Sequence, residues 1–231
     1  MRFDFFVLRL AWCGDYFQRK VFFKMKSLDW RDRVRALALR CVCVASAWAL
    51  GSSTALAHPN TGLGVGFVSG FTHPLTGIDH ILAMVAVGIW GTQLRKPAIW
   101  LLPVMFPLVM SVGGALGVRG VPLPGVEIGI AASAAILGLM IVLAARPPIW
   151  VAAMLVGAFA IFHGYAHGVE LPKAAYPLAY GVGFVLSTGL LHLTGITLGL
   201  MERWPLGVKA LRGMGAGISL AGVYLLLGLV R

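Results

Sequence analysis

Residues 126–145 read VEIGIAASAAILGLMIVLAA, an apolar stretch with the length of about 20 residues that a helix needs to cross a bilayer. Five further stretches of the same kind lie roughly at 74–93, 98–118, 148–170, 175–200 and 210–230. Prolines, glycines and charged side chains separate these stretches, as turn signals do between helices. The sequence therefore predicts an all-α integral membrane protein, a bundle of six transmembrane helices. A shorter apolar segment, Gly62–Phe71, is expected to be interfacial or re-entrant.

The overall composition supports a membrane protein. Of 231 residues, 59% are hydrophobic and 12% are charged, with a mean hydropathy of +0.87. A soluble globular protein averages about 25% charged residues. The net charge of +11 is concentrated upstream, since ten of the nineteen basic residues lie in residues 1–57. The others stand between apolar stretches, as loop charges that set orientation do. We therefore expect the lipid bilayer as a partner and no nucleic acid.

The first 57 residues have the features of an N-terminal extension and a cleaved secretory signal peptide. In residues 25–57 a basic region precedes the apolar run Cys41–Leu50, and Ala55-Leu56-Ala57 forms an A-x-A cleavage pattern. Translation is expected to start at Met25, and cleavage after Ala57 leaves residues 58–231 as the membrane domain. An uncleaved first transmembrane helix is the alternative, although the apolar run is shorter than a span requires.

Cleavage at this position makes His58 the mature N-terminus. A terminal histidine offers its α-amino group and its imidazole together as a bidentate chelate, and a metal readily deprotonates such an amine near neutral pH. His58 is therefore a candidate metal ligand, with an ordinary polar residue after the cleavage site as the alternative.

Two apolar stretches each carry a cluster of histidines and carboxylates, groups that are costly inside a bilayer. The first cluster is His73-Pro-Leu-Thr-Gly-Ile-Asp79-His80. Pro74 suits the first position of a helix, so His73 is expected to cap the outer end of the first span. His80 follows seven residues later and is expected on the same helical face, about 10 Å deeper, with Asp79 beside it.

The second cluster is His163-Gly-Tyr-Ala-His167-Gly-Val-Glu170, in the fourth span. Its three ionisable residues stand at i, i+4 and i+7, so they are predicted to line one face of the helix. Because the fourth span runs in the opposite direction to the first, both clusters fall in the outer half of the membrane. Glu127 opens the third span at the same end. This agreement in depth predicts one shared site.

The residue types in these clusters indicate a metal. Imidazole nitrogens and carboxylate oxygens are ligands of divalent first-row transition metals, and no cysteine follows residue 57 to supply a thiolate. His192, past the middle of the fifth span, is either an inner relay site or a hydrogen-bonded packing residue. The complete set of candidate metal ligands is His58, His73, Asp79, His80, Glu127, His163, His167, Glu170 and His192.

The distribution of basic residues favours an orientation with residue 58 outside. The inner side then holds six basic residues and the outer side three. The inner six are Arg95, Lys96, Arg146, Arg203, Lys209 and Arg212, and the outer three are Arg119, Lys173 and Arg231. The expected location is the bacterial inner membrane, with both the mature N-terminus and the C-terminus in the periplasm.

Other classes of protein fit the residues less well. His163-x-x-x-His167 has the histidine spacing of a zinc-protease motif, but Gly164 stands where the catalytic glutamate would be. The sequence contains no P-loop motif, and we do not expect an enzyme. A b-type haem protein, in which paired membrane histidines ligate iron, is one alternative. A metal receptor or storage protein that transports nothing is another.

At these residues the chain resembles the HupE/UreJ family of nickel/cobalt permeases. The resemblance runs from about His58 to the C-terminus. It is carried by the run His73-Pro74-Leu75-x-Gly77-x-Asp79-His80 and by Phe162-His163-Gly164-x-Ala166-His167-Gly168-x-Glu170. Glu127 before Gly129-Ile130-Ala131-Ala132-Ser133, and Thr188-Gly189 before His192, extend it.

The resemblance implies uptake of Ni²⁺ or Co²⁺ for metalloenzymes such as hydrogenase or urease, through six spans after a cleaved signal. Matched by position, the metal-handling residues would be His73, Asp79, His80, His163, His167 and Glu170. The metal is then a transported substrate, and we expect no permanently bound cofactor. A second copy of the chain and a metalloenzyme maturation system are further candidate partners. Ligand type alone does not separate Ni²⁺ from Co²⁺, Cu²⁺ or Zn²⁺, and passive and proton-coupled transport both fit the sequence.

Overall fold

The computed structural model describes residues 63–171 and 176–230, and all regular structure within them is helical. The elements, with η for a 3₁₀ helix, are α3 (Leu63–Thr72), η1 (His73–Leu75), α4 (Ile78–Leu94), α5 (Ala98–Val118), α6 (Val126–Leu143), α7 (Ile149–Val169), α8 (Pro177–Gly199), η2 (Leu200–Arg203) and α9 (Pro205–Leu229). The predicted extension, signal peptide and His58 lie outside the described residues.

Five helices of the described part are long and apolar enough to cross a membrane: α5, α6, α7, α8 together with η2, and α9. A sixth span is obtained if the segment Leu63–Leu75 and α4, which meet at an angle of 76°, are counted as one broken span. The prediction of an all-α, multi-pass membrane protein is therefore confirmed, and the sixth span rests on this bent pair.

The first predicted span, 74–93, is wrong at its start. The α-helix begins at Ile78, and Pro74 lies in the 3₁₀ turn η1. Gly77 precedes α4 in an extended conformation, with φ −88° and ψ 113°, and this interrupts the helical backbone. The hydroxyl of Thr76 donates to the carbonyl of His73 at 2.7 Å, which closes the turn. His73 and His80 consequently belong to separate helical segments.

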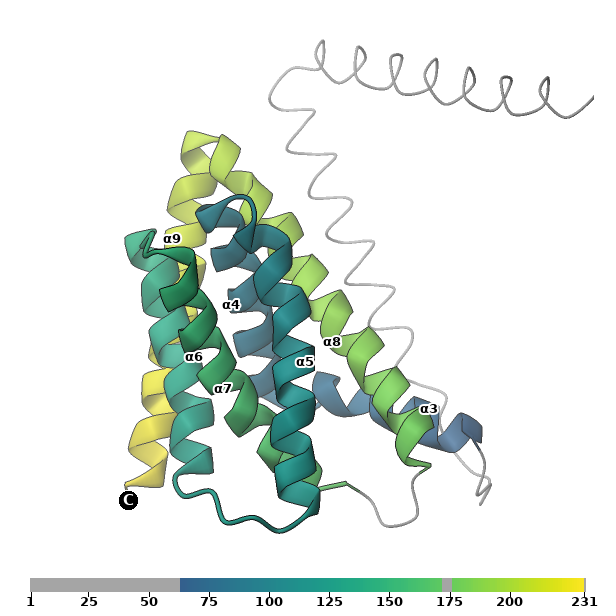
Figure 1. Cartoon of the computed structure of the whole chain (residues 1–231). Helices are drawn as coiled ribbons and strands as arrows, with labels where there is room; N and C mark the ends of the chain where they lie inside the picture. Colours follow the sequence, from purple (N-terminus) through teal and green to yellow (C-terminus); the bar gives the residue numbers. More distant parts are fainter. Residues whose placement is uncertain (1–62, 172–175, 231) are drawn as a thin grey trace, which may run out of the picture. The chain divides into compact units, whose positions relative to one another are not determined.

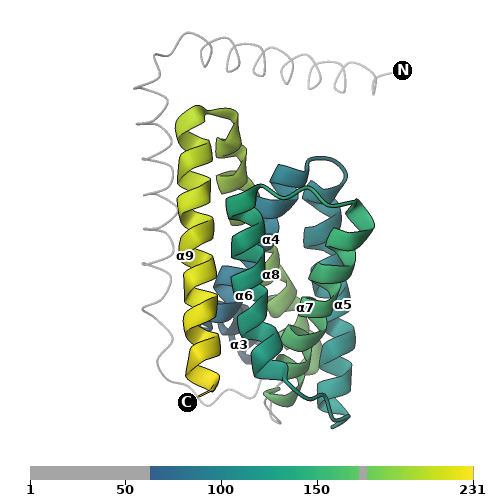
Figure 2. The ribbon, with the colours of Figure 1, turned by 90° about the vertical axis from the view of Figure 1, so that its left-hand side faces the viewer.

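Helix α4 is the central element of the described bundle and contacts α5, α6, α8 and α9 (Figures 1 and 2). Every residue from Ala86 to Gln93 is buried. Between Ile81 and Gly91 its sequence is apolar on all faces, a pattern typical of a helix that is surrounded by protein. His80, in the first turn of α4, is therefore buried, while the neighbouring Asp79 is half-buried.

Glycines on α7 allow that helix to approach α5 closely. A Cβ atom at Gly164 would collide with the carbonyl oxygen of Met110, and one at Gly168 would collide with that of Gly114. Small residues permit such close packing of membrane helices. The two glycines of the second cluster thus allow α7 to pack directly against the α5 backbone.

The helix connections gather at two ends. The turns between α4 and α5, α6 and α7, and α8 and α9 lie at one end, which we call the basic end, and α3 lies across the opposite end (Figure 1). At the basic end Arg146 forms an ion pair with Glu202 at 3.1 Å, and the Trp90 indole donates to the Ala145 carbonyl at 2.9 Å. Lys209 is exposed in the first turns of α9, which begins earlier than predicted, at Pro205.

Candidate metal-binding site

A cavity of about 340 Å³ lies at the end of the bundle opposite the basic end. Segments from η1, α4, α6, α7 and α9 contribute to its wall. Seven of the nine predicted ligands line it: His73, Asp79, His80, Glu127, His163, His167 and Glu170. The two sequence clusters, separated by about half of the membrane domain, therefore meet in one place, as their depths predicted.

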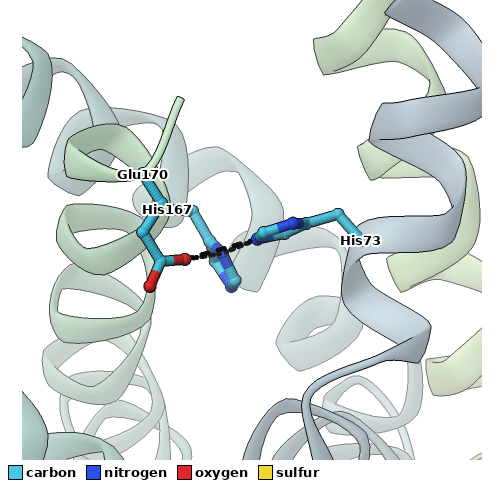
Figure 3. A group of neighbouring side chains, drawn as sticks. All are labelled: His73, His167 and Glu170. Carbon is cyan, nitrogen blue, oxygen red and sulfur yellow. Dashed lines mark hydrogen bonds and ion pairs between the residues drawn. The ribbon is translucent and has the colours of Figure 1, made fainter. Parts of the chain in front are cut away.

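Three of these side chains form a compact group at the cavity mouth (Figure 3). His73 Nε2 lies 2.9 Å from His167 Nδ1 and 3.4 Å from Glu170 Oε2. His167 Nδ1 lies 3.8 Å from the same carboxylate oxygen. His73 is presented by η1, whereas His167 and Glu170 come from the last turn of α7 and its C-terminal cap.

These separations suit the coordination sphere of a metal ion. Ligand atoms about 2.0–2.1 Å from a metal are about 3 Å apart when they are at right angles and about 3.4 Å apart in a tetrahedron. Two of the three distances in the group fall in that range, and the third needs a movement of a few tenths of an ångström. His73, His167 and Glu170 can therefore supply two nitrogens and one oxygen to a single ion.

A chain of imidazoles continues from this group toward the bundle interior. His167 Nε2 lies 3.3 Å from His80 Nδ1, and His80 Nε2 lies 3.5 Å from the Thr188 hydroxyl on α8. His73 and His167 are half-buried, whereas only 2% of His80 is exposed. The polar groups thus lead from the exposed mouth to a fully buried imidazole.

The prediction that His73 and His80 occupy one face of a continuous helix is wrong, because the backbone breaks between them. Both rings nevertheless contact His167, with centroid separations of 4.9 Å and 5.0 Å. At Thr76 and Gly77 the chain bends by 76°, so His73 lies beside the start of α4 and not on its continuation. The predicted alignment of His163, His167 and Glu170 along α7 agrees with their shared place in the cavity wall.

The two remaining carboxylates hold different positions. The Asp79 side chain accepts a hydrogen bond from the His80 backbone N–H at 2.8 Å, in the first turn of α4. A carboxylate there is favoured by the helix dipole and fixes the start of the helix that carries His80. Glu127 lies in the first turn of α6, exposed at the cavity wall. Both add negative charge where a cation would enter.

Comparison with known proteins agrees with this arrangement. The HupE / UreJ protein family matches residues 46–225. The chain belongs to the HupE/UreJ family. One curated relative, Protein HupE of Rhizobium leguminosarum bv. viciae, is 43% identical over 174 residues, which cover 75% of this chain and 91% of the relative. No solved structure matches the chain significantly.

The glycine at the protease-like position of this HupE/UreJ chain has a packing role. Gly164 faces the α5 backbone, and even a Cβ atom would collide there. A catalytic glutamate could not occupy that position without separating α5 from α7. The structure thus gives a physical reason against the metalloprotease interpretation of His163 and His167.

Sequence reasoning missed the aromatic wall of the site. The Phe184 ring on α8 contacts His167, His80 and His73, with centroid separations of 4.8 Å, 5.6 Å and 6.2 Å. A phenylalanine in an apolar helix carries no signal of its own, so only the packing of α8 against α4 and α3 reveals it. The apolar ring of Phe184 thus packs against all three imidazoles.

His192 does not line the cavity. It lies deeper on α8, with 1% of its surface exposed, and its ring contacts Phe106 of α5 at a centroid separation of 5.6 Å. The predicted position past the middle of the span agrees with this burial. Two of the nine candidate ligands in this HupE/UreJ chain are therefore not among the cavity residues. His192 lies away from the cavity, and His58 lies outside the described residues.

Proposed function

We propose that this protein transports Ni²⁺ or Co²⁺ across the membrane, taking the ion from outside through the cavity that His73, His167 and Glu170 line. The observation that carries the proposal is the close approach of these three side chains, which belong to two distant segments of the chain. Their donor atoms are the nitrogen and oxygen ligands that such metals accept. Family membership favours nickel and cobalt over other divalent ions.

The path from the mouth to the interior supports transport rather than storage. A storage site needs one set of ligands, whereas here the imidazoles continue from the half-buried His73 through His167 to the buried His80. An ion can pass along such a series because imidazole nitrogens replace its water molecules at each step. Because a charge is costly in a bilayer, a permeating cation requires a series of ligands, and this series leads from the cavity mouth to the buried His80.

The charges at the basic end support the proposed orientation. Five of the six basic residues predicted inside, Arg95, Lys96, Arg146, Arg203 and Lys209, belong to its turns or to the start of α9. By the positive-inside rule this end faces the cytoplasm, and the cavity then opens to the periplasm of the bacterial inner membrane. The metal is a substrate in this proposal, and the protein is not an enzyme.

The haem alternative fits the geometry poorly. His73 Nε2 and His167 Nδ1 are 2.9 Å apart, which leaves no room for a porphyrin between their two rings. The purified protein should accordingly be colourless before metal is added. A haem absorption band after purification would favour the haem alternative.

The test is uptake of radiolabelled nickel and cobalt into proteoliposomes that contain this chain alone. We expect saturable accumulation of at least one of these ions, absent from liposomes without protein. A His73→Ala, His167→Ala variant serves as the inserted but site-deficient control. Equal accumulation by the wild type and this control would contradict the proposal. Tight binding without accumulation would identify a receptor or storage protein.

A further inference from the structure

A second pair of histidines, His163 and His192, lies beyond the imidazole chain of the outer site. The ring of His80 contacts that of His163 at a centroid separation of 5.6 Å. His163 Nδ1 lies 2.9 Å from the Phe159 carbonyl, which can only accept, so Nδ1 carries the proton and Nε2 carries the lone pair. Nε2 has no hydrogen-bond partner among the described residues. It is a free acceptor, buried to 1% exposure.

His192 is more unusual, because neither of its ring nitrogens has a hydrogen-bond partner within residues 63–171 and 176–230. Buried side-chain nitrogens are hydrogen-bonded in the large majority of cases, and each exception requires an explanation. Leaving such a group unpaired costs about 1–3 kcal/mol. A packing histidine would be expected to find a carbonyl on a neighbouring helix, as His163 does at Phe159. The unpaired ring of His192 therefore points to a ligand.

One side chain, Phe106, contacts both histidines. Its ring packs edge-to-face with His163 at a centroid separation of 5.7 Å and with His192 at 5.6 Å. Phe106 and His192 are both absent from the lining of the outer cavity, whereas His163 belongs to it. The phenyl ring is thus a common neighbour of the two histidines.

The backbone beside Phe106 is less restrained than that of an ordinary helix. Pro103 and Pro107 both lie inside α5. Proline has no N–H, so each removes one hydrogen bond to the carbonyl four residues earlier and favours a kink there. In a membrane helix such positions are tolerated where neighbouring groups compensate. Phe106 therefore lies in the turn of α5 that can bend at the lowest cost.

Helix α8 connects the outer path to His192. Thr188, whose hydroxyl lies 3.5 Å from His80 Nε2, and His192 are four residues apart and share one face of α8. Four residues advance a helix by about 6 Å, so His192 lies one turn deeper than the last contact of the outer chain. The helix leads from the buried imidazole of His80 to the unpaired imidazole of His192.

We propose that His163 and His192 form an inner metal-binding site, and that the ring of Phe106, which contacts both histidines, moves aside when an ion binds there. This inference rests on the proposed function, since it assigns a second binding position to the same transported ion. The ligand is a divalent first-row cation taken through the His163 Nε2 lone pair and one nitrogen of His192. His163 serves both positions, because it contacts His80 and Phe106.

The test places a cysteine at the inner site, so that Co²⁺ bound there can be detected by its absorption. In full-length protein with Cys13, Cys41 and Cys43 replaced by serine, a His192→Cys substitution introduces the chain's one remaining thiol. Cobalt–thiolate bonds absorb in the near ultraviolet, whereas cobalt bound to nitrogen and oxygen alone does not give this charge-transfer band. With CoCl₂ added to this protein in nanodiscs, we expect the band to form and to weaken at least about tenfold in a further His163→Ala variant.

Leu191→Cys in the same background is the matched control, because Leu191 is equally buried on α8 but points to another face. It should give no band. Absence of the band from His192→Cys, while the outer site still binds Co²⁺, would overturn the inner site. A band of equal strength from both variants would do the same. If the wild type takes up neither ion in proteoliposomes, the proposed function fails, and this result is distinct from loss of the band.

A second variant keeps the test decisive if the cysteine protein does not fold. His192→Ala should reduce the rate of cobalt uptake at least about tenfold. Its outer site should still bind Co²⁺ with wild-type affinity. Phe106→Ala should allow an ion to reach the inner site faster, and Phe159→Ala, another buried aromatic substitution, should not. Unchanged uptake in His192→Ala would contradict the inner site.

Discussion

The imidazoles of His73 and His167 lie 2.9 Å apart, nitrogen to nitrogen, although 94 residues separate them along the chain. A short 3₁₀ turn presents the first ring and the last turn of α7 presents the second. If one ion binds both rings, the two residues contribute to one binding equilibrium. Their substitutions should then not be additive.

This non-additivity is the first prediction. His73→Ala and His167→Ala should each weaken Co²⁺ binding by at least about tenfold, and the double variant should lose less than the product of the two losses. Isothermal titration of the purified proteins measures the three constants. Fully additive losses would show that the two histidines do not share an ion. Tyr224→Phe, on the exposed face of α9, is a control that should bind as the wild type does.

The second prediction concerns Asp79. Its carboxylate accepts the His80 backbone N–H and lines the cavity. Asp79→Asn keeps an oxygen for that hydrogen bond but removes the negative charge, whereas Asp79→Ala removes both. We expect both variants to insert and to lose uptake, with Asp79→Asn the more stable in a thermal unfolding assay. Wild-type uptake by well-expressed Asp79→Ala protein would show that transport does not require this carboxylate.

The third prediction separates the packing glycines of α7 from the ligands. Gly164→Ala should lower the thermal unfolding temperature, because the added methyl group collides with the Met110 carbonyl and overpacking costs about 1–3 kcal/mol. Gly157→Ala on the same helix is the matched control, since its nearest neighbour is the flexible end of Met105 at 3.8 Å. Equal stability of the two variants would contradict the close contact between α5 and α7.

The fourth prediction is competition between protons and metal. Imidazole binds a metal in its neutral form and a carboxylate in its ionised form, so binding releases protons and acid must weaken it. Co²⁺ affinity should fall as the pH is lowered, because a protonated imidazole or carboxyl group no longer binds the ion. Affinity that does not change down to the lowest pH at which the protein stays folded would argue against histidine ligands.

The fifth prediction tests the expected mature N-terminus. If the α-amino group of His58 chelates metal, an alanine inserted between Ala57 and His58 should impair uptake at low metal concentration. Uptake at saturating metal should be unchanged, because the site formed by η1, α4 and α7 is not altered. Mass spectrometry verifies cleavage before the added alanine. Unchanged uptake at low concentration would show that the terminal amine has no role.

Much of the site could be predicted because its signals are local. Helical spacing places His163, His167 and Glu170 on one face, and apolar length locates the long helices. The break before α4 was missed because Pro74 is equally suited to a 3₁₀ turn and to the start of an α-helix. Phe184 and Phe106 were missed because an aromatic residue in a membrane helix has no functional signature until its neighbours are known.

The interruption between His73 and His80 has a consequence for metal selectivity. Helix α7 is held against α5 by backbone contacts at Gly164 and Gly168, so the positions of His167 and Glu170 are fixed. His73 is joined to α4 through the two-residue segment Thr76-Gly77, so we expect its ring to shift relative to α7 more easily than the two α7 ligands do. The length and stiffness of that segment therefore set how large an ion the three ligands can enclose. Selection for a different metal should alter Thr76 and Gly77 before it alters any ligand.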